Sequence, residues 1–199
     1  MNELEGQGPV APRPLTAPLA LYQLKLTLAE IRPPIWRRLL VPNDVNLRRL
    51  HNIIQEVGGW GNYHLHEFTI AGTRYGRPDH YGELSYRSDA HVRLNALPLG
   101  EGAAFEYIYD LGDHWKIEVQ VEKVLPLDTK DKRQVVCLGG ARAFPPEDSG
   151  GVPGYELLLE SLSDPKHPEH EEYRAWAGED YDPERFDLKE TNERLKGMR

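Results

Sequence analysis

Apolar and polar residues alternate along two neighbouring segments near the start of the chain, residues 21–31 and 35–41. A period of two is typical of a β-strand that buries one face. Between the two segments stands Arg32-Pro33-Pro34, which interrupts the pattern because the residue before a proline is restricted and proline donates no backbone hydrogen bond. The pattern therefore predicts two consecutive strands.

The next apolar residues recur with helical spacing. Five of them fall within about 120° of a helical wheel, namely Leu47, Leu50, Ile53, Ile54 and Val57. Asn46 stands at the N-cap position and Gly58 at the end of this segment, as is typical of a helix. Residues 64–70 are strand-like again. The chain is therefore predicted to begin in the order strand-strand-helix-strand.

The strongest strand signal lies in the middle of the chain. Residues 104–110 and 114–124 carry apolar and aromatic side chains at alternate positions, so we predict that they pair as an antiparallel hairpin. The turn sequence Asp110-Leu111-Gly112-Asp113 separates them. If the loop has an even number of residues, Asp110 and Asp113 face each other across the strands and repel unless a cation, a proton or water separates their charges.

The remaining segments are less regular. Residues 74–100 form a long excursion with one short strand expected at 91–94, and the glycine- and proline-rich sequence after residue 137 is expected to end the sheet. Three helical patterns follow, over 155–162, 168–178 and 188–195. Strands first and helices last predict an α+β fold, in which a mostly antiparallel sheet of five to six strands packs against helices, with further helices at the C-terminus.

The 199-residue chain is long enough for one sizeable core, and 39% of its residues are apolar. Residues 1–19 are rich in proline and glycine and include no continuous apolar stretch, so we expect a flexible arm and no signal peptide. Residues 20–197 are expected to form a single domain.

The single cysteine, Cys137, cannot form an intramolecular disulfide, which fits a cytoplasmic location.

The charge is unevenly distributed. The chain carries a net charge of −8, and residues 147–199, with 15 acidic and 7 basic side chains, account for the same imbalance. This acidity disfavours unaided binding to nucleic acid, and the composition excludes a membrane span, so we expect no membrane partner. A cluster of arginines is the one feature that favours nucleic-acid binding. These arginines either bind phosphate or pair with carboxylates inside the protein. The cluster comprises Arg32, Arg37, Arg38, Arg48 and Arg49.

Two histidines suggest metal chemistry. On a strand, the spacing of His64 and His66 directs both imidazoles to one side, a geometry that suits two metal ligands. Asp110 and Asp113 are the further ligands we consider, with His114, Glu147, Asp148 and Cys137 also available. The chain carries no established metal-binding motif, so no cofactor is indicated beyond this candidate divalent ion. The structural alternative is one histidine hydrogen-bonded at the core edge and the other exposed.

Four blocks of the sequence resemble the plasmid pRiA4b ORF-3-like family in order and approximate spacing, over about residues 21–195. They are Ile35-Trp36-Arg37-Arg38, Trp60-Gly61-Asn62-Tyr63-His64-Leu65-His66-Glu67-Phe68, Tyr109-Asp110-Leu111-Gly112-Asp113-His114-Trp115 and Pro145-Pro146-Glu147-Asp148-Ser149-Gly150-Gly151. The resemblance implies a family without an established biochemical role, found in mobile-element contexts and sometimes labelled resolvase-like.

The sequence departs from that family at three positions. Leu111 stands where the family usually has Phe, Ile117 where it usually has His, and Ser149 where it often has Cys. If catalysis or metal binding in the family used those side chains, this protein has lost or relocated that chemistry.

Three functions remain open, and the sequence leaves undecided whether the protein is an enzyme. The leading hypothesis is a noncatalytic module that binds an unidentified protein or peptide in an aromatic groove around Trp60, Tyr63, Tyr75 and Trp115. The first alternative is a metal-assisted hydrolase or nuclease with a His/Asp cluster. The second is a DNA-associated adaptor that uses the arginines. The candidate groove comprises Trp60, Tyr63, His64, His66, Tyr109, Asp110, Asp113, His114, Trp115, Glu147 and Asp148.

Overall fold

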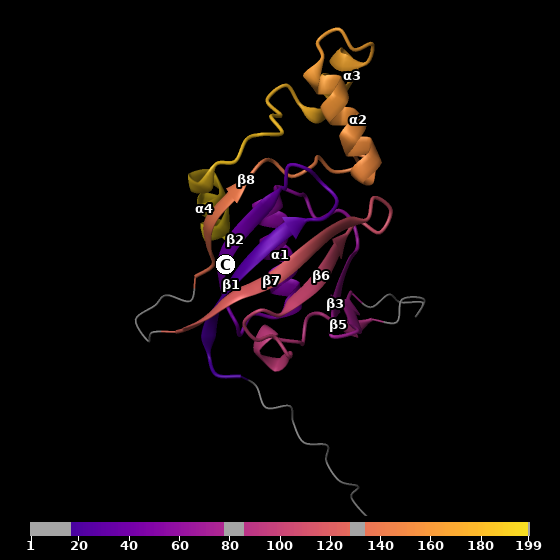
Figure 1. Cartoon of the computed structure of the whole chain (residues 1–199). Coiled ribbons are helices and arrows are strands. Elements are labelled where there is room, and N and C mark those ends of the chain that lie inside the picture. The colour runs from indigo at the N-terminus through magenta and orange to yellow at the C-terminus, as the bar shows by residue number, and fades with distance from the viewer. Residues whose placement is uncertain (1–16, 78–85, 128–133, 199) are drawn as a thin grey trace, which may run out of the picture.

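The computed structural model describes residues 17–77, 86–127 and 134–198 (Figure 1). Of the predicted arm, residues 1–16 lie outside these ranges, and the remainder runs alongside the domain. The N–H of Ala17 donates to the carbonyl of Asn95 at 2.8 Å. Ala17 and Pro18 of the predicted arm are therefore held by hydrogen bonds to the body of the protein.

One mixed sheet of eight strands forms the centre of the molecule. Its strands lie in the order β5-β4-β3-β6-β7-β1-β2-β8, and every pairing is antiparallel except that of β4 with β5. The strands are β1 (Ala20–Leu28), β2 (Trp36–Pro42), β3 (His66–Ile70), β4 (Thr73–Gly76), β5 (Arg87–Ser88), β6 (Ala104–Tyr109), β7 (Trp115–Pro126) and β8 (Val136–Ala141).

The α+β class and the C-terminal helices are confirmed, but the prediction of five to six mostly antiparallel strands is wrong. The sheet has eight strands, and one pair is parallel. The missed strands are short and lie on one side of the sheet: β5, at the edge, spans two residues, and its neighbour β4 spans four. Such segments are too short for a period of two to stand out.

Four helices and one 3-10 turn accompany the sheet. They are α1 (Leu47–Gly58), η1 (Leu94–Ala96), α2 (Gly151–Ser163), α3 (His170–Ala177) and α4 (Leu188–Gly197). The strand predicted at 91–94 does not form: Arg93 makes an isolated bridge with Asn46, and η1 begins at Leu94. In Figure 1, α4 lies beside β2 and β8, whereas α2 and α3 stand beyond one end of the sheet. Among the described helices, none has the length and apolar surface needed to cross a membrane.

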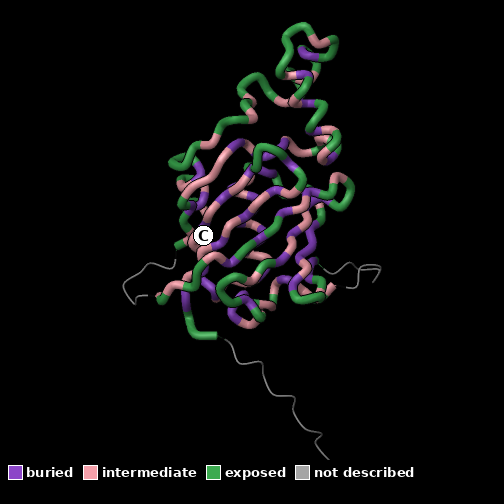
Figure 2. Tube along the Cα trace, viewed as in Figure 1, coloured by how far each residue is buried: buried purple, intermediate pink, exposed green. Residues whose placement is uncertain are grey.

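The core lies on one face of the sheet, against α1. Buried and partly exposed residues alternate along the strands (Figure 2), and Leu24 and Leu26 of β1 are fully buried. The helix begins as predicted, because the side chain of Asn46 accepts a hydrogen bond from the N–H of Arg49 at 2.8 Å. It ends at Gly58, and the next residue, Gly59, has a φ of 77° and forms the left-handed cap that glycine favours.

The expectation that the sheet ends after residue 137 is wrong, because β8 continues to Ala141. Its glycines serve close packing in a strand. A Cβ on Gly140 would lie 2.7 Å from Cδ of Arg37 and 2.8 Å from the carbonyl oxygen of Trp36. The Arg37 guanidinium lies over the rings of Phe144 and Phe186, 4.9 and 4.5 Å from their centroids. Glycine therefore lets β8 approach this arginine closely.

A polar network crosses the core between α1 and β6. The amide nitrogen of Gln55 donates to the hydroxyl of Tyr107 at 3.0 Å, and that hydroxyl lies 2.8 Å from Nδ1 of His51. The Tyr107 hydroxyl therefore donates to Nδ1, which leaves Nε2 to donate to Oδ1 of Asn62 at 2.7 Å. Burial, and next the neighbouring His66, lower the pKa of His51 to about 3. The imidazole is therefore neutral at physiological pH.

We predict that this buried imidazole makes the fold sensitive to mild acid. The unfolded chain takes up a proton near the ordinary histidine pKa of about 6.5 and the folded chain does not, so stability falls as pH falls below that value. Between pH 7 and 5 the free energy of unfolding should drop by about 2 kcal/mol more than in a His51→Gln variant, whose side chain does not titrate. Urea unfolding at both pH values measures this, and equal drops in the two proteins would contradict it.

Candidate functional site

The hairpin loop does not meet the condition under which the two turn aspartates would face each other. Tyr109 pairs with Trp115, so the loop spans residues 110–114 and has an odd length. Asp110 and Asp113 therefore do not face each other across the strands. Oδ1 of Asp110 accepts from the N–H of Gly112 at 2.9 Å and closes the loop on itself.

A histidine and two carboxylates converge beside this loop. Nδ1 of His64 lies 3.6 Å from Oδ2 of Asp110, and its Nε2 lies 3.1 Å from Oδ1 of Asp148. One ligand atom from each residue lies within 4.8 Å of the others, and in the described parts of the chain this is the one such group. The His64 and Asp110 side chains are 28% and 12% exposed, and that of Asp148 is 71% exposed. The cluster is therefore open to solvent on the Asp148 side.

The imidazole of His64 is incompletely satisfied by the protein. Its Nε2 is shielded from solvent and makes no hydrogen bond of acceptable geometry, although Asp148 is near. An imidazole nitrogen in this position is available as a metal ligand.

The turn that carries Asp148, residues 145–150, is attached to the sheet by side chains from three other segments. The indole N–H of Trp60 donates to the carbonyl of Pro145 at 2.9 Å, and the Tyr109 hydroxyl donates to the Glu147 carboxylate. Burial, and next that carboxylate, raise the pKa of Tyr109. Oδ2 of Asp113 accepts from the N–H of Gly150 at 3.0 Å. Glu147 and Asp113 therefore position the turn and leave Asp148 directed at His64.

Strained backbone conformations are concentrated around the His64 cluster. Four residues that are not glycine have positive φ here: Asn62 at 60°, Asp110 at 56°, His114 at 59° and Asp148 at 58°. Two of the four belong to the His64 cluster. Asparagine, aspartate and histidine tolerate this conformation better than other residues, but it still costs free energy. Strained residues persist where the surrounding structure holds them, which is common at functional sites.

The structure separates His66 from His64. His66 begins β3 and is buried, with Nε2 3.0 Å from Oδ2 of Asp89 and its ring stacked 3.7 Å from that of His51. Because His64 precedes the strand, the rule that alternate residues share a face does not apply to this pair.

Asp89, the partner of His66, is a residue that sequence reasoning missed. It also binds Arg48 at 2.6 Å. Burial opposes ionisation of Asp89, but the hydrogen bonds from His66 and Arg48 lower its pKa to about 2.

The remaining predicted ligands also lie outside the cluster. Asp113 is bonded to the 145–150 turn, and His114 is exposed, with its backbone N–H donating to the carbonyl of Asp110 at 2.6 Å. Of the four residues predicted as metal ligands, the structure therefore brings together His64 and Asp110, and it adds Asp148 from the wider set.

Most aromatic residues of the predicted groove are core residues. Trp60, Tyr109 and Trp115 are 7%, 1% and 1% exposed. Tyr75 is also buried, whereas Tyr63 is 80% exposed. The rings of Trp60 and Tyr109 stack 4.8 Å apart. The buried rings therefore belong to the core beneath the site. Tyr63 is the one aromatic side chain of the predicted groove that is exposed to a partner.

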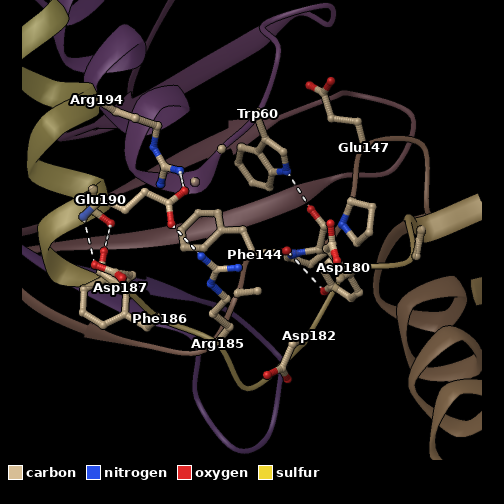
Figure 3. A pocket seen from close by; sticks show the side chains of 18 of the residues that line it. Trp60, Phe144, Glu147, Asp180, Asp182, Arg185, Phe186, Asp187, Glu190 and Arg194 are labelled. Atoms are coloured by element: carbon tan, nitrogen blue, oxygen red, sulfur yellow. Dashed lines mark hydrogen bonds and ion pairs between the residues drawn. The ribbon is translucent and has the colours of Figure 1, made fainter.

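Trp60 nevertheless lines one wall of a cavity of about 350 Å³ between Phe144 and α4 (Figure 3). Glu190 accepts from Arg185 at 2.9 Å and from Arg194 at 3.0 Å on the opposite wall. The acidic residues around the cavity are Glu147, Asp180, Asp182, Asp187 and Glu190. The cavity is therefore richer in carboxylates than in free cations.

The arginines considered for DNA binding have partners within the protein. Arg37 is buried, and it donates to the carbonyls of Val57 and Ala141 at 3.2 and 3.0 Å. Arg38 binds Glu122 at 2.6 Å, which lowers the pKa of that carboxyl to about 2. These contacts fit the structural interpretation of the arginine cluster.

Fold and site together define an α+β protein in which a mixed eight-stranded sheet carries a histidine-carboxylate cluster at one end. A sequence profile described as "Plasmid pRiA4b ORF-3-like protein" matches residues 20–190. The chain belongs to this family.

Two similar proteins carry no described role. The uncharacterized protein y4hQ of Sinorhizobium fredii (strain NBRC 101917 / NGR234) is 33% identical over 182 residues, which cover 90% of this chain and 92% of that protein. The crystal structure of a protein of unknown function, MM3350 from Methanosarcina mazei Go1, matches with a TM-score of 0.75 at 38% identity. That match covers 86% of this chain and 97% of the other.

We predict that the close approach between Gly151 and the hairpin loop maintains the site. A Cβ on Gly151, whose φ is 68°, would lie 2.5 Å from the carbonyl oxygen of Asp113. Gly151→Ala should therefore lower the free energy of unfolding by about 2–3 kcal/mol, from backbone strain and the clash together. Gly72→Ala is the matched control, because Gly72 has a φ of 74° and open space around it. Chemical denaturation compares the two, and equal losses would show that the approach to Asp113 contributes nothing.

Proposed function

We propose that this protein binds a divalent metal ion at His64, Asp110 and Asp148 and uses it to activate water for hydrolysis. The observation that supports this most directly is the convergence of one imidazole and two carboxylates to within 4.8 Å, from three separate segments of the chain. Local turn chemistry explains an isolated aspartate, but it does not explain why Asp148 is directed at a histidine distant in sequence.

The spacing of the ligand atoms suits such an ion. Neighbouring ligands of an octahedral ion with bonds of about 2.1 Å lie about 3 Å apart, and Nε2 of His64 lies 3.1 Å from Oδ1 of Asp148. The 3.6 Å separation from Asp110 is measured from Nδ1, on the opposite side of the ring, so for an ion at Nε2 Asp110 is a ligand only within the 4.8 Å span of the three ligand atoms. Carboxylate and imidazole together suit Mn²⁺ and Zn²⁺. Three protein ligands leave positions for water and substrate, as in catalytic metal sites, and a bound ion lowers the pKa of its water.

The other two hypotheses have less support. The aromatic residues proposed for a groove are mostly buried, and the arginines proposed for DNA contacts bond within the protein. The mobile-element context and the cytoplasmic location stay predictions.

The metal site is tested by titrating Mn²⁺ into the full chain by isothermal calorimetry. We expect one bound ion per chain. Loss of a residue that merely supports a ligand already weakens metal binding about 10–100-fold, so Asp148→Asn should weaken it at least that much. Asp148 is 71% exposed, so this substitution should leave the fold intact. Glu118→Gln, at an exposed carboxylate of β7 outside the cluster, should bind Mn²⁺ as the wild type does.

Hydrolysis is followed in the same proteins with p-nitrophenyl acetate, an uncharged ester. The rate should rise when Mn²⁺ is added to the wild type and to Glu118→Gln, but not when it is added to Asp148→Asn. Equal Mn²⁺ affinity in all three proteins would refute the metal site, and metal binding without any hydrolysis would refute the catalytic role.

A second candidate function, binding of a peptide with basic side chains, is favoured by the acidic cavity beside Trp60 (Figure 3). Arg37 is engaged with carbonyl groups, and Arg185 and Arg194 share Glu190, so the other carboxylates around the cavity can receive a partner's cations.

We predict that a hexalysine peptide shifts the NMR resonance of the Trp60 indole N–H, which lies at this cavity. The shift should be at least halved in a variant carrying Asp180→Asn and Asp182→Asn, because the attraction between opposite charges is lost. Glu118→Gln should keep the full shift. The same response in all three proteins would contradict a specific site.

A further inference from the structure

A second cavity of about 350 Å³ lies on the other side of His64, between α1 and the start of β3. Its polar lining includes Arg48, Asn52, Asn62, His64 and Arg77. Among its described lining residues none is a carboxylate. His64 therefore separates two regions of opposite character: the carboxylates of Asp110 and Asp148 on one side, and a surface of cations and amides on the other.

Arg77 supplies the net positive charge of this cavity. Its side chain is exposed, and within the described ranges no hydrogen bond or ion pair engages its guanidinium. An unpaired guanidinium has five N–H donors in a planar fork that matches the oxygen atoms of phosphate.

Arg48 supplies donors that are already oriented. Its Nε and Nη2 bind the fully buried carboxylate of Asp89, at 3.3 and 2.6 Å, while 44% of its side chain is exposed. Asp89 offsets the charge of Arg48, but it also holds the guanidinium in place. Arg48 therefore loses little side-chain freedom when a ligand binds. The remaining nitrogen, Nη1, has no hydrogen-bond partner among the described residues and is free to donate.

We propose that this cavity binds the phosphoryl group of a small phosphate monoester and places it beside the metal ion. The inference rests on the proposed function, since it names the substrate of that site. Asp110 and Asp148 offset the charge of the ion, so Arg77 supplies the net positive charge that attracts a monoester, which carries about −1.5 to −2 charges at pH 7. The cavity volume lies at the lower end of the range for small-molecule sites, which suits a phosphoryl group with a small substituent.

The reaction balances with water as the one co-reactant. The oxygen of the metal-bound water forms a bond to phosphorus, and the ester P–O bond breaks. The water gives up one proton and the leaving alkoxide gains one, so the products are an alcohol and hydrogen phosphate. Arg77 and Arg48 bind and orient the phosphoryl oxygens, and His64, which lines the cavity and is also a ligand of the ion, is the residue at which the two parts of the site adjoin.

Binding is tested first with inorganic phosphate alone, by ³¹P NMR titration of the full chain without metal. Loss of a charged hydrogen-bond donor typically weakens binding by about ten- to a hundredfold, and we expect that loss in Arg77→Gln. Arg93→Gln is the matched control, because Arg93 is exposed and lies outside the cavity. Equal phosphate affinity in all three proteins would overturn the phosphate site.

Hydrolysis is tested next with Mn²⁺ present, by comparing p-nitrophenyl phosphate with p-nitrophenyl acetate. Arg77→Gln should raise KM for the phosphate ester about ten- to a hundredfold and leave acetate hydrolysis unchanged. Arg93→Gln should match the wild type with both. If Arg77→Gln impairs both esters alike, or neither, the assignment of a phosphate monoester is wrong.

The two arms distinguish failure of this inference from failure of the metal site. Phosphate binding that depends on Arg77, in a protein that binds no Mn²⁺, would overturn the proposed hydrolysis and its substrate but keep the anion site. Mn²⁺ binding and acetate hydrolysis with no phosphate binding would overturn the anion site and leave the proposed function standing.

Discussion

The contacts of Tyr109 hold the candidate site together. Its buried ring stacks on Trp60, and its hydroxyl accepts from the N–H of Tyr63 at 3.0 Å while donating to Glu147. One residue of β6 thereby joins the segment between α1 and β3 to the turn that carries Asp148. Because a buried hydroxyl left without partners is costly, this residue strongly favours an arrangement in which β6, the segment between α1 and β3, and the turn meet at one end of the sheet.

The two sides of the cluster differ in burial. On the side of α1, the neutral His51 and the ion pair of Asp89 with Arg48 are built into the core. On the other side, Asp148 lies on an exposed turn that is tied by single hydrogen bonds. A site that combines a buried wall with an exposed ligand can admit an ion or substrate from solvent without disturbing the fold. His64, which lies between these two sides, is the residue on which both the metal and the phosphate proposals depend.

The elements with long, regular patterns were predictable because their periodicity reflects burial on one face. The helix from Leu47 and the strands around Trp115 formed as expected, with limits changed by one or two residues. The edge strands were not predictable, since β5 is too short to carry a pattern and Gly140 of β8 resembles a turn residue. Glycine can signal a turn or a close approach, and only the neighbouring Arg37 distinguishes the two.

For the site, the sequence alone identified the residue types and two of the three clustered ligands, because histidine and aspartate in a hairpin and its neighbouring strand were already visible. Tertiary structure decided the remainder. The odd loop length turned Asp113 toward Gly150, the start of β3 at His66 separated that histidine from His64, and the 145–150 turn supplied Asp148. These outcomes depend on register, strand ends and contacts between distant segments, which the order of residues along one segment does not specify.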